Sequence, residues 1–161
     1  MELSKRIEAL EHIRSISRVK TISLQKIDNA INDNIALEEV LRLTTEDYEW
    51  QCQQFEAVQG KLEFKEFLSR YSNRVSFSMH FLSGYDITLD DDHCNARGEW
   101  VIWQPFTIEE TAWILAGRSV DTFTLDSQQW KISRTQLIVE ILTPWTDTWG
   151  EELVSSKWRW P

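Results

Sequence analysis

Apolar side chains recur at helical spacing through the first part of the chain. The stripe consists of Leu3, Ile7, Leu10, Ile13, Ile16, Val19, Ile22, Ile27, Ala30 and Ile31. Four serine and threonine residues between positions 15 and 23 lower the helix propensity in the middle of this stripe. The pattern therefore predicts one helix from about Leu3 to Arg14 and a second that reaches Asn32. A short third helix is expected from Ile35 to Leu43.

From Glu46 to Gln54 the polar pattern alternates at strand spacing, and helical spacing returns from Lys61 to Tyr71 after Gly60. The remainder reads as strands separated by turn-forming residues, which favours antiparallel hairpins, and Pro144 ends the last strand. These strands are expected over Val75 to Leu82, Tyr85 to Asp90, Cys94 to Phe106, Glu110 to Leu125 and Trp130 to Leu142. Helices followed by a meander predict an α+β domain whose helices pack on one face of a curved antiparallel sheet.

Length and charge narrow the classes of protein. The chain has 161 residues, enough for one ordinary domain. We expect that domain over residues 1–150, followed by a tryptophan-rich tail over residues 151–161. With 17 basic and 26 acidic side chains the net charge is −9, which argues against nucleic acid as a partner. The sequence contains no apolar run long enough to predict a membrane span, and its N-terminus lacks the pattern of a signal peptide. A cytoplasmic location is therefore expected.

Nine tryptophans are the unusual feature of the composition. Five fall on predicted strands, where they form either core or the wall of a pocket; these are Trp50, Trp100, Trp103, Trp113 and Trp130. The other four lie near the C-terminus, where they are expected to cover a rim or a subunit contact; these are Trp145, Trp149, Trp158 and Trp160. The strand from Cys94 to Phe106 carries apolar residues on both faces, which favours a partner subunit on one of them.

Of the three histidines, His80 is the candidate for chemistry, because it lies within a predicted strand beside aromatic residues. It is either a hydrogen-bonded core histidine or a general acid or base in a cavity. No metal motif accompanies it, since no His-x-His or Cys-x-x-Cys pair occurs and the two cysteines are too far apart. The acidic run at Asp90 fits a solvated turn, and we expect no metal site and no cofactor.

Several segments together resemble the SnoaL-like branch of the nuclear transport factor 2-like superfamily. They are the helices followed by strands, Met79-His80-Phe81-Leu82-Ser83, the run from Trp113 to Asp121, the run from Gln129 to Arg134, and the closing run from Leu142 to Trp149. The resemblance extends from about Leu10 to Trp149. It implies a cone-shaped domain, in which a bent antiparallel sheet wraps around helices and encloses a pocket.

Within that branch the chain is similar to the scytalone dehydratase and bile acid 7α-dehydratase families. The resemblance implies that His80 is catalytic and works with an aspartate on a helix. A gapless reading places Ile31 at the position of that aspartate, whereas Asp28 lies one helical turn earlier on a similar face. A second pocket histidine of the scytalone dehydratases falls near Trp103, so Arg118 or Glu99 is considered as another polar group of the pocket.

Two functions remain open from the sequence, and whether the protein is an enzyme is open with them. One is a cofactor-independent dehydratase or isomerase that acts through His80 and Asp28 on a cyclic or polyketide-like compound. Its pocket would be lined by Trp50, Trp103 and Trp113, which suit a small apolar or aromatic molecule. The other is a noncatalytic ligand-binding or subunit-type protein, similar to the small subunit of ring-hydroxylating dioxygenases. For either function we expect a homodimer or homotrimer.

Overall fold

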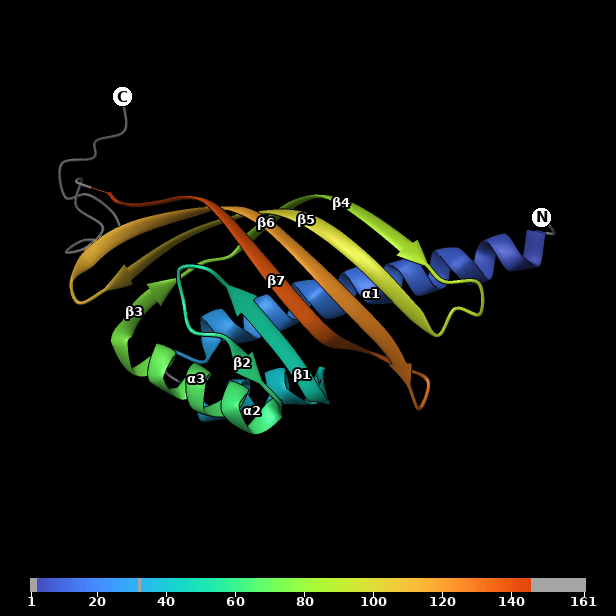
Figure 1. Cartoon of the computed structure of the whole chain (residues 1–161), viewed down its shortest axis with the longest axis horizontal. Coiled ribbons are helices and arrows are strands. Elements are labelled where there is room, and N and C mark those ends of the chain that lie inside the picture. Colours follow the sequence, from blue (N-terminus) through green and yellow to red (C-terminus); the bar gives the residue numbers. More distant parts are fainter. Residues whose placement is uncertain (1–2, 32, 146–161) are drawn as a thin grey trace, which may run out of the picture.

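The computed structural model describes residues 3–31 and 33–145, with three helices and seven strands in that part of the chain (Figure 1). The helices are α1 (Leu3–Asn29), α2 (Asn34–Arg42) and α3 (Lys61–Arg74). The strands are β1 (Thr44–Cys52), β2 (Val58–Gln59), β3 (Val75–Ser78), β4 (Phe81–Leu89), β5 (Asn95–Ile108), β6 (Thr111–Asp126) and β7 (Gln129–Pro144). The predicted α+β class is confirmed.

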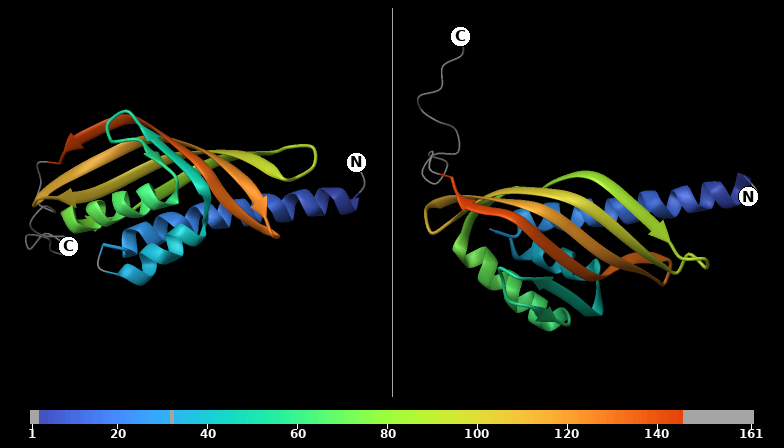
Figure 2. Two further views of the ribbon diagram at one scale, coloured as in Figure 1. Left: turned by 60° about the horizontal axis from the view of Figure 1, so that its bottom comes forward. Right: turned by 45° about the horizontal axis from the view of Figure 1, so that its top comes forward.

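Helix α1 is continuous, so the predicted division near Arg14 is wrong. The hydroxyl groups that were expected to interrupt it donate to carbonyls of the preceding turn instead: Ser15 Oγ to Glu11 O at 2.9 Å and Thr21 Oγ1 to Ser17 O at 2.9 Å. Such bonds satisfy the side chain without opening the helix. The N-terminal end of α1 projects beyond the sheet, where Leu3 is exposed (Figures 1 and 2).

The seven strands form one strongly curled sheet in the order β2-β1-β7-β6-β5-β3, with β4 also paired to β5. Neighbouring strands are antiparallel except β1 and β7, which are parallel, with Trp50 opposite Thr135. The sheet is therefore mixed, whereas a wholly antiparallel sheet was expected. Helix α3 and strands β2 to β6 lie between β1 and β7 in the chain, and this long connection brings β1 alongside β7 in the parallel direction.

The segment around His80 differs from the continuous strand predicted over Val75 to Leu82. Strand β3 ends at Ser78 and β4 begins at Phe81, and both pair with β5. His80 thus lies in a two-residue break between strands. The turn expected at Ser83 and Gly84 is instead an irregularity inside β4, where Gly84 has a φ of 49°. These two deviations bend the edge of the sheet around the helices.

The core lies between α1 and the concave face of the sheet (Figure 2). Ile16 of α1 belongs to a buried cluster that includes Trp100 of β5 and Phe123 of β6. The Trp100 ring covers Gly98, since a Cβ atom at position 98 would lie only 2.2 Å from the ring. Buried aromatic area of this kind is the main source of stability in a curled sheet packed on helices.

None of the helices in the described part of the chain has the length and apolar character that crossing a membrane requires. Cys52 and Cys94 are both free thiols. Trp145 is partly exposed at the end of β7. The predicted tail over residues 151–161, which contains Trp158 and Trp160, lies outside the described residues. So does Trp149.

Candidate functional site

A cavity of about 110 Å³ opens between the helices and the concave face of the sheet. Its walls are mainly apolar and aromatic, from α1, β1, α3 and β5 to β7; they include Leu24, Trp50, Phe64, Phe67, Ile102 and Leu137. Polar side chains reach the cavity from two groups, one that contains His80 and one that contains Lys20. A mostly apolar cavity with a few placed polar groups is the usual form of a small-molecule site.

His80 and Asp28 meet at one of these polar groups. The Nδ1 atom of His80 lies 2.6 Å from Asp28 Oδ1, although the two residues are 52 positions apart in the chain. The backbone N–H of His80 also donates to Asp28 Oδ2 at 2.8 Å. The side chains of His80 and Asp28 are only 9% and 16% exposed. The break between β3 and β4 lets both backbone and ring of His80 face the same carboxylate, an arrangement that a regular strand would not allow.

Three further polar side chains hold this pair in place. Ser78 Oγ donates to Asp28 Oδ1 at 2.8 Å, and Gln104 Nε2 donates to Ser78 Oγ at 2.9 Å. Gln104 Nε2 also lies 2.9 Å from the hydroxyl of Tyr71, which accepts its hydrogen bond. Burial raises the pKa of Tyr71 to about 12, so this hydroxyl is neutral near pH 7. Neither Gln104 nor Tyr71 was predicted from the sequence as part of the site, because each has the pattern of an ordinary strand or helix residue.

The network assigns the protonation of the pair. Burial alone would raise the pKa of Asp28, but hydrogen bonds from His80 and Ser78, and the positive charge that His80 carries when protonated, outweigh it, so that this pKa lies below its ordinary value. An ionised Asp28 accepts hydrogen bonds only, and His80 therefore carries its proton on Nδ1. Within the described residues Nε2 makes no hydrogen bond, and His80 lines the cavity. The geometry leaves Nε2 able to accept a proton from a bound molecule.

The structure brings only one of the remaining predicted pocket residues to the cavity. Trp50 lines the cavity, as expected. Trp103 does not: it is 43% exposed on the convex face of the sheet. Arg118 is also on that face, with its side chain 52% exposed and paired with Glu140. Trp113 and Ile31 are half-buried and, rather than lining the cavity, pack against a second buried cluster, which includes Val75, Phe106 and Leu115.

Strand periodicity explains the misplaced residues. Side chains alternate between the two faces of β5, and Ile102 and Gln104 point into the cavity, so Trp103 between them must point outward. Trp103 lies opposite Ala116, and Val101 lies opposite Arg118, which extends the outward face across β6. The alternation of side chains between the two faces of β5 could be predicted from the sequence, but the face that encloses the cavity could not.

The second polar group of the cavity was missed entirely. Lys20 of α1, Ser119 of β6 and Thr135 of β7 line the cavity around Asp121, which is fully buried. The only sequence signal was a lysine within the apolar stripe of a helix, four residues after Ile16 and four before Leu24. Such a lysine is usually interpreted as an exposed side chain that folds back over its neighbours.

One group of possible metal ligands occurs among the described residues, at Glu8, His12 and His93, with ligand atoms within 4.8 Å of one another. It lies outside the cavity. His12 Nδ1 accepts a hydrogen bond from Trp130 Nε1 at 3.1 Å. Since the indole can only donate, Nδ1 is occupied and neutral His12 carries its proton on Nε2, which makes it a poor metal ligand.

Comparison with models of protein families identifies the family of the chain. The model of the SnoaL-like domain matches residues 9–136. The chain therefore belongs to the family of SnoaL-like domains, as the sequence resemblance suggested. No curated protein matches the chain significantly.

Solved structures agree on the fold. A candidate scytalone dehydratase from Novosphingobium aromaticivorans is similar with a TM-score of 0.76 and 22% identity, over 85% of this chain and 89% of that one. A candidate aromatic ring hydroxylase from the same organism has a TM-score of 0.77 and 16% identity, over 84% and 94%. The type 3 hexachlorocyclohexane dehydrochlorinase from Novosphingobium barchaimii has a TM-score of 0.76 and 12% identity, over 88% and 94%. At these identities the likeness establishes the cone-shaped α+β fold and nothing finer.

Proposed function

We propose that this SnoaL-like protein is a cofactor-independent enzyme that removes a proton from a small, mostly apolar cyclic compound, leading to dehydration or isomerisation. The observation that carries the proposal is the contact of 2.6 Å between His80 Nδ1 and Asp28 Oδ1 beside an apolar cavity. In this proposal His80 is the general base and Asp28 is a positioning residue that fixes the tautomer and stabilises the imidazolium. Two of the proteins with a similar fold are named as a dehydratase and a dehydrochlorinase, and both names denote eliminations, which agrees with this class of reaction.

His80 alone carries out both proton transfers of the proposed reaction. Nε2 takes the proton from a carbon beside a carbonyl group, and the electrons of that C–H bond form the enolate. In a dehydration, the enolate expels the neighbouring hydroxyl, which takes the proton from Nε2 and leaves as water. In an isomerisation, the same proton returns to a different carbon. Aromatic walls such as Trp50 and Phe67 bury the ring of the compound and hold it against His80.

A simple cyclic ketone tests the proton transfer without knowledge of the natural substrate. Exchange of the C1 protons of 2-tetralone for deuterium in D2O, followed by proton NMR, measures carbon deprotonation directly. The wild-type protein is expected to accelerate this exchange, and His80→Gln is expected to reduce the acceleration by about 10²–10⁴-fold. His93→Gln is the matched control, because His93 lies in the turn after β4 and outside the cavity.

The alternative is a noncatalytic ligand-binding or subunit-type protein, since the same fold serves both classes. Binding of 2-tetralone by the wild-type protein without any acceleration of exchange would refute the catalytic proposal in favour of this alternative. A homodimer or homotrimer and a cytoplasmic location also remain predictions. Size-exclusion chromatography with light scattering tests the first of these.

A further inference from the structure

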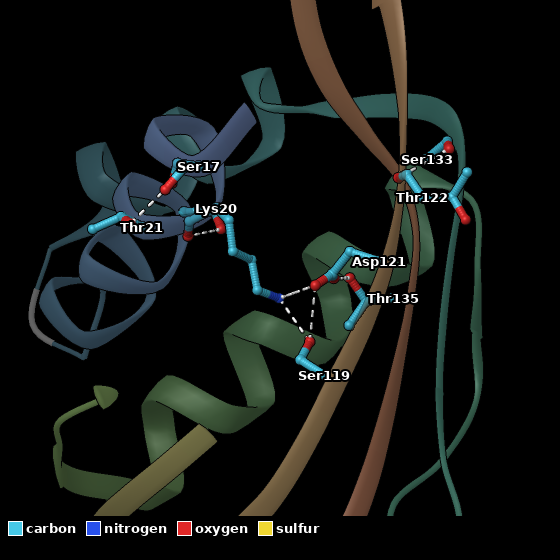
Figure 3. A network of polar contacts seen from close by, with 9 residues as sticks. Ser17, Lys20, Thr21, Ser119, Asp121, Thr122, Ser133 and Thr135 are labelled. Carbon is cyan, nitrogen blue, oxygen red and sulfur yellow. Dashed lines mark hydrogen bonds and ion pairs between the residues drawn. The ribbon is translucent and has the colours of Figure 1, made fainter. Parts of the chain in front are cut away.

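A buried lysine reaches the cavity from the same helix that carries Asp28. Lys20 is 2% exposed, and its side chain extends from α1 to strand β6 (Figure 3). Its Nζ atom lies 2.8 Å from Ser119 Oγ, 2.9 Å from Asp121 Oδ1 and 2.8 Å from Asp121 Oδ2. Thr135 Oγ1 donates to Asp121 Oδ1 at 2.5 Å, and Ser119 Oγ donates to Oδ2 at 3.0 Å. We call Lys20, Ser119, Asp121 and Thr135 the lysine cluster.

Packing alone does not account for the lysine cluster. A buried ion pair rarely stabilises a fold more than apolar side chains of similar volume would, because both charges lose their hydration. The pair nevertheless adjoins the cavity, since Lys20, Ser119 and Thr135 all line it. Tyr48 adds another polar group at the same place, and burial together with the nearby Asp121 carboxylate raises the pKa of its hydroxyl, which stays neutral.

The cluster has a donor to offer to a ligand. An ammonium group has three N–H bonds, and those of Lys20 meet two groups, the Ser119 hydroxyl and the Asp121 carboxylate, whose Oδ1 and Oδ2 lie 2.9 and 2.8 Å from Nζ. The ring centroid of Trp100 lies 5.6 Å from Nζ, close enough to favour the positive charge. When the two carboxylate oxygens of Asp121 share one N–H, the third N–H of Lys20 is available to an oxygen atom that enters the cavity.

The charges beside the cavity select against an anion. Asp121 balances Lys20, and Asp28 contributes a further negative charge at the other polar group. A carboxylate ligand would therefore meet a site with an excess of negative charge, whereas an uncharged carbonyl or hydroxyl oxygen can accept from Lys20 at no such cost. Lys20 and Asp28 are eight residues apart on helix α1, so their Cα positions are separated by a rise of about 12 Å along the helix axis.

We propose that the lysine cluster is a second binding subsite of the cavity, which recognises an uncharged carbonyl or hydroxyl oxygen at the end of the ligand distant from His80. The ligand is then a neutral compound of two or three rings with oxygen functions at opposite ends and apolar carbon between them. The inference rests on the proposed function in one respect, that a small molecule occupies the cavity. It does not require that His80 be catalytic.

Three related ketones test the subsite by calorimetric titration. 2-Tetralone carries one oxygen, 6-hydroxy-2-tetralone carries a second at the opposite end, and 6-carboxy-2-tetralone carries a charge there. The wild-type protein is expected to bind the hydroxy compound about tenfold more tightly than 2-tetralone, which is the effect of one additional hydrogen bond to a charged donor. The carboxy compound is expected to bind more weakly than the hydroxy compound.

The variant Lys20→Met/Asp121→Asn removes both charges and so leaves no uncompensated ion. It is expected to lose the tenfold preference while its affinity for 2-tetralone stays within about twofold of the wild-type value. The same pair of changes at an exposed ion pair, Lys131→Met/Asp126→Asn, is the matched control and should keep the preference. Should the double variant fail to fold, Ser119→Ala is the second variant, because it keeps the ion pair between Lys20 and Asp121. It releases the N–H of Lys20 that Ser119 accepts, so the preference for the hydroxy compound over 2-tetralone is expected to differ from tenfold.

The outcomes separate the subsite from catalysis. His80→Gln should lose deuterium exchange but retain the tenfold preference, and a wild-type protein with the preference but without exchange would refute only the proposed function. A preference that persists in Lys20→Met/Asp121→Asn would overturn the subsite. Equal binding of the three ketones by the wild-type protein, or binding of none of them, would overturn the ligand class.

Discussion

Replacing Lys20 alone by methionine is expected to destabilise the fold far more than the loss of a lysine from a helix usually does. Methionine has a similar length and helix propensity, so the change removes mainly the charge. It leaves Asp121, which is fully buried, without its counter-ion at 2.8 Å. Breaking one side of a buried pair costs about 3–5 kcal/mol. For a domain of this size that loss lowers Tm by about 10–15 °C.

Urea unfolding at pH 7, followed by tryptophan fluorescence, measures this loss as a change in midpoint at constant slope. The complete cycle also includes Asp121→Asn and the double variant Lys20→Met/Asp121→Asn. Because the double variant buries no unpaired charge, it should be more stable than Lys20→Met, and the cycle then gives a favourable coupling between the two residues. Single and double variants with additive losses would refute the argument, because additivity means that the two charges do not depend on each other.

Three other predictions concern separate parts of the site. The pKa of Asp28 lies below its ordinary value of 3.8, so the contribution of the ionised Asp28 to stability is complete above pH 3.8 and is lost as the pH falls below that value. In urea titrations, the wild-type protein should therefore lose more stability between pH 5 and pH 3 than the variant Asp28→Asn. Equal losses would contradict the network around Asp28. Gly98→Ala should cost about 1–3 kcal/mol in the same assay, because its Cβ would lie 2.2 Å from the Trp100 ring, and an unchanged midpoint would be inconsistent with that packing. Trp50→Ala should weaken 2-tetralone binding about tenfold in calorimetry whereas Trp103→Ala should not, and equal effects would place the ligand elsewhere.

The succession of helices and strands was predictable because it depends on local periodicity. The parallel contact between β1 and β7 was not, since it joins segments some ninety positions apart and leaves no mark on either pattern. The continuity of α1 was also misjudged. Hydroxyl side chains such as Ser15 favour turns in isolation, but here they bond within a helix that the sheet holds in place.

The candidate site was predictable only in part. His80 and Asp28 came from the family resemblance together with helical spacing, and the structure brings them together. Lys20 and Asp121 were invisible because each is ordinary in its own segment, and only the fold makes them a pair. Gln104 was missed for the same reason: it follows Trp103 in a strand whose inward face the sequence did not identify.

Strand β5 divides the protein into two surfaces that can change independently. Gln104 and Ile102 belong to the cavity, whereas Trp103 and Val101, their immediate neighbours in the chain, belong to the outside. A substitution at an odd-numbered position of this stretch alters what the convex face meets, and one at an even-numbered position alters what fits inside. Selection for a new ligand and selection for a new surface contact can therefore act on adjacent codons without conflict.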